Sequence, residues 1–362
     1  MPRFEVSPDI AIAKTLSKDF YLDGATFDES KQKIFAPTWQ WAGDVQDVGE
    51  NGAVSPFTLL EGFISEPLML SRDQKGDLYC LSNVCTHRGN IIIEKPCKVN
   101  DLRCKYHGRR FRSDGVFLSM PEFKEVQNFP TESDNLNKLP LHQFGRSIFT
   151  SLQPSRPADD FFAEMANRIS WMPLDRYEFR PDLSRDYLVN AHWALYCENY
   201  LEGFHIPYVH AGLNTVVDYG SYTTELYRYS NLQIGFSRNN ETAFDLPGSS
   251  PDFGKRVAAY YYWVFPNTMF NFYPWGLSVN IVKPVSLSET KVSFRIYMFD
   301  ESRFDKSAGA DLHGVEMEDE DVVEHVQLGI RSRFYDRGRY SVTREQGTHH
   351  FHRLLSEFMN AS

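Results

Sequence analysis

A short stretch in the middle of the chain places two imidazoles and a carboxylate within nine residues, as Glu202, His205 and His210. Residues 190–197 lack Gly and Pro and repeat apolar side chains every three to four positions, which predicts a helix leading into this stretch. On a helix Glu202 and His205 share a face, and Pro207 would end or kink that helix and return His210 beside His205. Two imidazoles and a carboxylate from elsewhere would hold a ferrous ion with positions open for oxygen. The alternative is a buried helix with two hydrogen-bonded histidines.

A second group of ligand types lies earlier in the chain, where Cys85-x-His87 is followed by Cys104-x-x-His107. The chain has 5 Cys and 11 His in 362 residues, so two such pairs are unlikely to arise by chance. Two Cys and two His on two loops suit a Rieske [2Fe–2S] cluster, in which cysteines hold one iron and histidines the other. A four-ligand zinc site and a set of unrelated core residues are the alternatives.

Composition limits the kinds of partner. The net charge of −10 argues against nucleic acid or an anionic membrane as the main partner. The polar, Pro-containing N-terminus does not resemble a secretory signal, and no apolar run approaches the roughly 20 residues of a membrane span. We therefore expect a cytoplasmic protein. The 28 Phe, 19 Tyr and 6 Trp supply bulk for cores and for an aromatic pocket.

Changes in residue composition along the chain predict two domains. Residues 1–38 suggest a helical segment that packs on the larger domain. Residues 39–153 alternate short apolar runs with Gly, Pro, Asn and Asp, which is typical of an all-β domain. Residues 154–362 mix a β-rich region at 222–299 with a helical tail at 316–359, so the overall fold class is α+β.

Taken together, the two motifs resemble those of the Rieske non-haem iron oxygenases over nearly the whole chain. Cys85-x-His87-Arg-Gly and Cys104-x-Tyr-His107-Gly are similar to the cluster motif of that family. Glu198-Asn-Tyr-x-Glu202-x-x-His205-x4-His210 is similar to its mononuclear iron motif. The resemblance implies that residues 39–153 form a Rieske [2Fe–2S] domain. It also implies that residues 154–362 form a catalytic domain, with a central antiparallel sheet flanked by helices around a mononuclear Fe(II).

The same resemblance implies a function. The protein would be an oxygenase that uses O2, takes electrons from a reductase or ferredoxin, and hydroxylates a small molecule. The family precedent also implies a homotrimer. The implied cluster ligands are Cys85, His87, Cys104 and His107, the implied iron ligands include His205 and His210, and the implied catalytic residues are Asn199 and Glu202.

An acid must complete the iron site, and the candidates lie in the run from Glu316 to Glu324. Most of these acids are expected to be the solvated start of a helix, where carboxylates are favourable. Asp319 shares a helical face with apolar residues, namely Val322, Val323, Val326 and Ile330. The family pattern, an acid eight residues before a Val-Gln pair, also selects Asp319. Asp321 is the alternative.

Glu202 has a separate role in the family pattern. The acid three residues before the first histidine ligand connects the cluster of a neighbouring subunit to the iron site, here from His107 to His205. Most members carry Asp at this position, and Glu is typical of a branch that acts on quaternary ammonium compounds. The alternative is that Glu202 is a plain salt-bridge partner.

Residues 257–275 form the most aromatic stretch. On a strand, Tyr261, Trp263 and Phe265 share one face, and Tyr260 and Tyr262 the other. The stretch is either hydrophobic core or a cage for a cationic ligand, because Trp and Tyr faces attract quaternary ammonium groups. The candidate substrate contacts are Tyr262, Trp263, Tyr273 and Trp275.

This stretch and residues 200–203 resemble the choline monooxygenase subgroup. The expected substrate is therefore a small quaternary ammonium compound such as choline, a betaine or carnitine, undergoing hydroxylation or N-demethylation. An aromatic-ring hydroxylating or O-demethylating oxygenase of the same family is the first alternative. A non-catalytic iron–sulfur electron carrier or a zinc-stabilised binding module is the alternative of another class.

Two further features concern the surface. Basic residues gather around the cluster motif and predict a docking face for an acidic electron donor: Arg88, Lys98, Arg103, Lys105, Arg109, Arg110 and Arg112. His349, His350 and His352 are assigned to the polar face of the last helix, with no metal.

Overall fold

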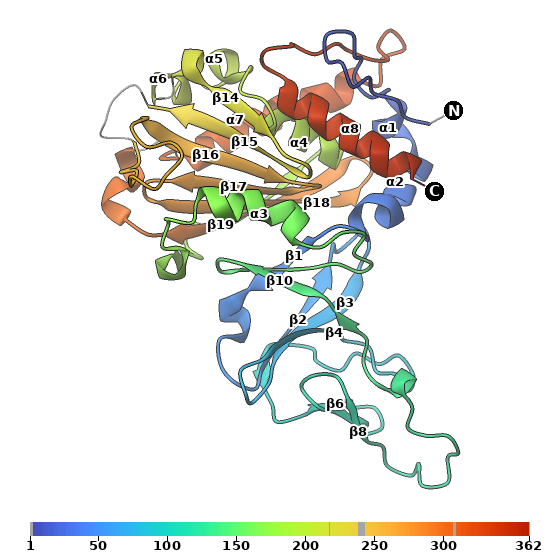
Figure 1. Cartoon of the computed structure of the whole chain (residues 1–362). Coiled ribbons are helices and arrows are strands. Elements are labelled where there is room, and N and C mark those ends of the chain that lie inside the picture. The colour runs from blue at the N-terminus through green and yellow to red at the C-terminus, as the bar shows by residue number, and fades with distance from the viewer. Residues whose placement is uncertain (1–2, 217, 238–242, 307–308, 362) are drawn as a thin grey trace. The chain divides into compact units, whose positions relative to one another are not determined.

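The computed structural model describes residues 3–216, 218–237, 243–306 and 309–361. These residues form two compact units (Figure 1). The smaller unit is Ala36–Ser155, and the larger unit joins Met1–Phe35 to Arg156–Ser362. The domain limits expected from the sequence, residues 39 and 153, both lie within the smaller unit. The junction falls between Ser155 and Arg156, inside the Pro-flanked linker.

The smaller unit is built from three antiparallel sheets, as its short apolar runs predict. Two of them have three strands: β1 (Gln40–Asp44), β11 (Ser147–Thr150) and β10 (Leu141–Phe144), and β6 (Leu102–Arg103), β7 (Arg110–Phe111) and β8 (Phe117–Ser119). The third has the order β5 (Cys97–Lys98), β2 (Ala53–Leu59), β3 (Glu66–Arg72), β4 (Leu78–Ser82) and β9 (Lys138–Leu139). Its core includes Met69, Leu81 and Phe111 together with the motif cysteines Cys85 and Cys104.

The larger unit is organised around an eight-stranded antiparallel sheet. Its strands are, in spatial order, β12 (Glu178–Phe179), β19 (Glu289–Met298), β18 (Gly276–Ser286), β17 (Thr268–Tyr273), β16 (Val257–Val264), β15 (Ser230–Phe236) and β14 (Thr223–Leu226), with β13 (Arg185–Val189) also paired to β19. The sequences of β16 and β17 are nearly continuous runs of apolar and aromatic residues, because both faces of these central strands are buried.

Helices cover the two faces of this sheet (Figure 1). The helices of the larger unit are α1 (Asp19–Leu22), α2 (Gly24–Ser30), α3 (Asp159–Arg168), α4 (Trp193–Tyr200), α5 (Ile206–Val209), α6 (Leu213–Val216), α7 (Leu312–Gly329) and α8 (Gln346–Asn360). Trp263 of β16 contacts Phe351 of α8. Tyr260, on the opposite face of the same strand, donates to Asp252, which also binds Arg168 of α3. The alternation expected for this strand is therefore present.

The histidines of the last helix contradict the sequence prediction. His352 is fully buried, with Nδ1 2.6 Å from the Tyr340 hydroxyl and Nε2 3.1 Å from a carboxylate oxygen of Glu198. His349 is also buried. The prediction of a polar face was wrong because α8 lies on the sheet, and its histidines find polar partners within the core. Among the described residues, no helix is both long and apolar enough to span a bilayer.

Candidate active site

The segment that carries the histidine motif is a helix, a turn and a second short helix. His192 caps the start of α4, its side chain accepting from the amide of Ala194, and the helix runs from Trp193 to Tyr200. Glu202 and His205 therefore lie beyond the helix, and the prediction that they share a helical face was wrong. Pro207 sits in the first turn of α5 and does not end the preceding helix. A proline fits there because the first helical amides need no partner within the helix.

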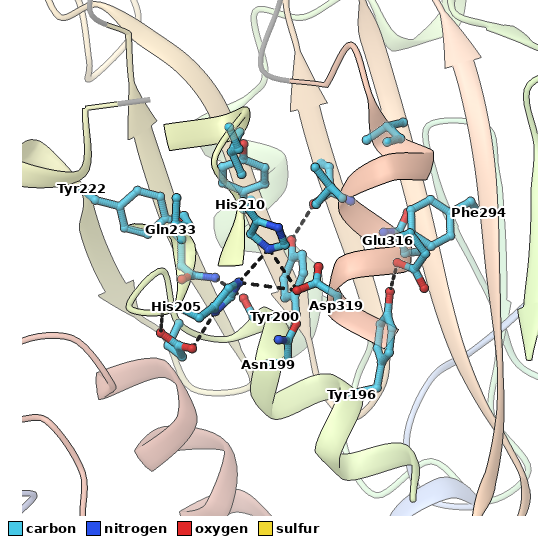
Figure 2. Close-up of a pocket in the computed structure, with 18 of the residues that line it drawn as sticks. Tyr196, Asn199, Tyr200, His205, His210, Tyr222, Gln233, Phe294, Glu316 and Asp319 are labelled. Carbon is cyan, nitrogen blue, oxygen red and sulfur yellow. Dashed lines mark hydrogen bonds and ion pairs between the residues drawn. The ribbon is translucent and has the colours of Figure 1, made fainter. Parts of the chain in front are cut away.

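The helix, turn and second helix bring His205 and His210 together, as the sequence predicts. His205 precedes α5 and His210 follows it, and their Nε2 atoms are 3.1 Å apart. Asp319, on α7, brings Oδ1 to 3.0 Å from Nε2 of His210 and 3.6 Å from Nε2 of His205 (Figure 2). One ligand atom from each residue lies within 4.8 Å of the other two. This is the donor set of a 2-His-1-carboxylate site.

Two further carboxylates orient the imidazoles. Oε1 of Glu202 lies 2.7 Å from Nδ1 of His205, and Oε2 of Glu318 lies 2.7 Å from Nδ1 of His210. Each Nδ1 donates its hydrogen outward, so each Nε2 points inward with a lone pair. Two lone pairs and the Asp319 carboxylate thus face one another, and only a cation makes that arrangement favourable. The residues present therefore fit a divalent metal such as Fe(II).

The pKa of His210 also indicates that this site favours a cation. Burial acts to lower the pKa of His210, but the carboxylates of Asp319 and Glu318 outweigh it and raise that pKa above its ordinary value. The pocket thus attracts positive charge at this position.

The alternative acid is placed elsewhere. The side chain of Asp321 is 74% exposed and lies beside His325, away from the histidine pair. The face predicted for α7 is only partly right, because Val323 is buried whereas Val326 is 42% exposed. The buried face instead runs through Glu316, Val323 and Gln327, and Asp319 lies at its edge.

A small cavity of ≈ 110 Å³ adjoins the histidines. Ligand sites for drug-sized molecules occupy about 300–1,000 Å³, so this one suits a small substrate. Its lining combines aromatic side chains with amides and acids: Tyr196, Asn199, Tyr200, Glu202, His205, Ile206, His210, Leu213, Tyr222, Gln233, Tyr261, Asn271, Tyr273, Asn280, Phe294, Leu312, Val315, Glu316 and Asp319. Figure 2 shows most of these side chains, gathered between the sheet and the helices.

Only one of the four candidate substrate contacts lines the cavity. Tyr273 does so, whereas Trp275 stacks behind it with ring centroids 5.1 Å apart. Trp263 packs against α8, and Tyr262 is fully buried on the other face of the strand. The aromatic stretch also reaches the cavity through Tyr261, which was not among the candidates, because alternation cannot show which end of a face meets a cavity.

The two cluster loops share one conformation. The amide of Gly89 donates to the carbonyl of Cys85 at 3.0 Å, and the amide of Gly108 donates to the carbonyl of Cys104 at 3.0 Å. Both glycines have positive φ, +70° and +77°, which an L side chain rarely adopts. Each loop therefore folds tightly around its cysteine.

The same loops bring the histidines together. The ring centroids of His87 and His107 are 4.8 Å apart, and both cysteines are buried. Burial acts to raise the pKa of the Cys104 thiol, but the backbone amide of Tyr106 and the thiol of Cys85 outweigh it and lower that pKa, whereas burial raises the pKa of Cys85. Amides directed at sulfur favour a thiolate ligand, so these four side chains fit a Rieske cluster.

Of the seven basic residues around the cluster motif, Arg109 alone is buried, and the prediction that it belongs to an exposed docking face was wrong. The other six are exposed, and for them the docking face stays a prediction. Arg109 is 2% exposed, bound to Asp134 at 2.7 Å, and its guanidinium lies over the Phe117 ring. Arg110 is paired with Asp101. The other ion pairs of this group are Lys98–Glu50, Lys105–Glu94 and Arg112–Asp114. Arg109 is thus a core residue of the smaller unit, because neighbouring acids and aromatic rings accommodate its charge.

Comparison with known proteins decides the family. The Rieske [2Fe–2S] domain family matches residues 38–130, and the catalytic domain of ring-hydroxylating alpha subunits matches residues 174–361. The chain belongs to the Rieske oxygenases. This confirms the enzyme class, the α+β fold and both cofactors, a [2Fe–2S] cluster and a mononuclear iron. As a Rieske oxygenase, the enzyme takes electrons from a reductase or ferredoxin and acts on a small molecule.

Similar proteins include two named monooxygenases. The choline monooxygenase of Arabidopsis thaliana is 29% identical over 371 residues, covering 97% of this chain and 85% of the relative. The carnitine monooxygenase oxygenase subunit of Acinetobacter pittii is 26% identical, covering 98% and 96%. A solved quaternary ammonium Rieske monooxygenase superposes with a TM-score of 0.81 at 22% identity, covering 98% and 99% of the two chains, which supports the fold.

Proposed function

We propose that this Rieske oxygenase hydroxylates a small quaternary ammonium compound at the iron site formed by His205, His210 and Asp319. The observation that carries the proposal is the small cavity beside these residues, with tyrosine rings on several sides. Relatives named for choline and for carnitine support the same substrate class.

The aromatic lining suits a quaternary ammonium group in particular. Such a group has no N–H to donate, so it is recognised by ring faces and by negative charge. The hydroxyl of Tyr200 donates to Asn271 at 2.8 Å and lies 3.1 Å from the carbonyl of Tyr262. These two contacts hold the Tyr200 ring at the cavity wall, and they satisfy its hydroxyl without a partner from the ligand.

The proposed cofactor ligands follow from the geometry described above. Cys85, His87, Cys104 and His107 would hold the [2Fe–2S] cluster. When bound, the mononuclear iron supplies the binding and activation of O2. The reaction converts a C–H bond to C–OH and uses two electrons and two protons to release the second oxygen atom as water.

Glu202 and Asn199 are proposed to serve this chemistry. Glu202 holds His205 by its Nδ1 hydrogen and also accepts from the amides of Phe204 and His205. These contacts fix its position beside His205, and we propose that it connects this histidine to the cluster of a neighbouring subunit, as in the family pattern. Asn199 lines the cavity from α4.

The proposed electron path needs a neighbouring copy. The solved relative is described as using inter-subunit electron transfer, and a homotrimer is the assembly we propose here. The molar mass in solution, measured by light scattering, tests it, and a monomer would contradict it. A cytoplasmic location stays a prediction, since the plant relatives are named chloroplastic.

A product screen tests the proposed function. The holoenzyme, a generic reductase and NADH are supplied with choline, L-carnitine or γ-butyrobetaine, and with benzoate as an aromatic acid, and products are identified by mass spectrometry. We expect oxygen uptake coupled to product with at least one ammonium compound. Hydroxylation of an N-methyl carbon leads to loss of that carbon as formaldehyde, whereas hydroxylation of an alcohol carbon leads to an aldehyde hydrate. Coupled turnover of the aromatic acid alone would reject the proposal.

A further inference from the structure

The charged residues around the cavity are acidic. Glu202, Glu316 and Asp319 line it, and the described lining residues include no Lys or Arg. Glu202 is bound to His205, and Asp319 belongs to the metal site. Glu316 is therefore the lining acid that neither binds a histidine nor belongs to the metal site.

Glu316 is held in an unusual way for a carboxyl group. It lies on α7, one turn before Asp319, and it is 2% exposed. The hydroxyl of Tyr196 donates to Oε2 at 2.5 Å, whereas Oε1 is buried and has no hydrogen-bond partner (Figure 2). Leaving a buried carboxyl oxygen unpaired is costly, and burial raises the pKa of Glu316 well above its ordinary value, so the charged form of this acid needs a cation beside it. Because Glu316 lines the cavity, we expect its unpaired oxygen to find a partner on the bound ligand.

The charge of the cavity lining favours a ligand without a carboxylate. The side-chain nitrogen of Gln233 donates to the carbonyl of Tyr200, and that of Asn271 donates to the carbonyl of Ser278. Asn199 and Asn280 also line the cavity, but a carboxylate there would still meet three acids, with no Lys or Arg from the described lining to offset its desolvation. A cation meets the opposite situation, because ring faces and Glu316 both attract it.

We propose that Glu316 is the counter-ion for the ammonium group of the substrate and that the pocket selects a cationic quaternary ammonium alcohol over a zwitterion that carries a carboxylate. This inference rests on the proposed function and narrows it. Glu316 acts as a specificity-determining residue: it binds the charged group, and Tyr196 positions it. The preferred substrate class is that of choline, and carnitine and glycine betaine belong to the disfavoured class.

Three probes and two variants test the inference. The probes are choline, its uncharged carbon isostere 3,3-dimethyl-1-butanol, and the zwitterion L-carnitine. Glu316→Gln removes the charge but keeps the shape and the partner of Tyr196. Glu320→Gln, on the same helix but outside the cavity lining, is the matched control for loss of one acid. Binding to the anaerobic holoenzyme is measured by calorimetry, and kcat and KM by coupled product formation.

We expect the wild type to bind choline more tightly than either other probe. Glu316→Gln should weaken choline binding and raise its KM by about 10- to 100-fold, the usual range for loss of a hydrogen-bonded or paired charge. Binding of the carbon isostere should change less than threefold. Glu320→Gln should leave all three affinities near those of the wild type, and the iron content of both variants should match the wild type.

The outcomes separate this inference from the proposed function. Turnover of ammonium compounds with equal effects of Glu316→Gln on choline and on the carbon isostere would overturn the role of Glu316 alone. Preference of the wild type for L-carnitine over choline would also overturn it. Failure of every ammonium compound to be turned over, with a coupled aromatic substrate, would instead remove the proposed function.

Discussion

Replacing Arg109 by Met tests whether this arginine is part of the domain core or part of a docking surface. Its guanidinium is 2.7 Å from a carboxylate oxygen of Asp134 and lies over the rings of Phe111, Phe117 and Phe129. Removing one partner of a buried ion pair costs about 3–5 kcal/mol. The Asp134 side chain is 19% exposed and can recover some solvation, so the lower end applies. We expect a loss of about 3 kcal/mol in the free energy of unfolding.

The matched control is Arg110→Met, which removes the same charge from the adjacent residue. Arg110 is 47% exposed and pairs with Asp101 at the surface, so its loss should change the free energy of unfolding little. Thermal scans of the cluster absorbance and denaturant titrations of the holoenzyme measure both effects. A fall of about 10 °C for Arg109→Met, with little change for the control, is expected. Equal stability of both variants, with slower electron delivery to Arg109→Met, would refute the core assignment.

Three further predictions concern the larger unit. Glu318→Gln removes one carboxylate behind the iron site and should weaken iron affinity by about 10- to 100-fold in chelator competition; unchanged affinity would contradict the orienting role. Gly347→Ala places a Cβ 2.2 Å from the carbonyl oxygen of Leu201 and should cost about 1–3 kcal/mol of stability and reduce bound iron, whereas Gly329→Ala, in open space, should be tolerated. Burial lowers the pKa of His192 to about 3, so its stabilising effect is complete above pH 6.5 and is lost as the pH falls toward 3. His192→Asn should therefore reduce the loss of stability between pH 7 and 5.5 by about 1 kcal/mol, measured by denaturant titration; an identical loss would count against it.

The sequence predicted those parts of the molecule that depend on local spacing. The cluster loops and the histidine pair lie within short motifs, so residue type and separation were enough to predict them. The sheet-forming regions and the helical tail were predicted for the same reason, since periodicity and proline positions reflect local backbone preferences. Asp319 was selected among neighbouring acids by its position on a helical face, and the structure places it beside the histidines.

The features that were not predicted from the sequence depend on contacts between distant segments of the chain. Glu316 and Glu318 were assigned to a solvated helix start, but α7 packs so that one is buried and the other reaches His210. A signal was present for Glu316, which lies seven residues before the buried Val323 on the same helical face. Arg109 was assigned to the surface by charge alone, because nothing near it in sequence reveals the phenylalanine rings that enclose it.

The central claim is that His205, His210 and Asp319 hold an iron distinct from the Rieske cluster. Iron and acid-labile sulfide analysis of the purified holoenzyme tests it most directly, with Asp319→Ala as the test variant and the exposed Asp321→Ala as its matched control. We predict about three iron atoms and about two sulfides per chain in the wild type and the control. Asp319→Ala should lose about one iron, keep its sulfide and retain the cluster spectrum. Unchanged iron in Asp319→Ala, or loss of iron in Asp321→Ala instead, would contradict the account.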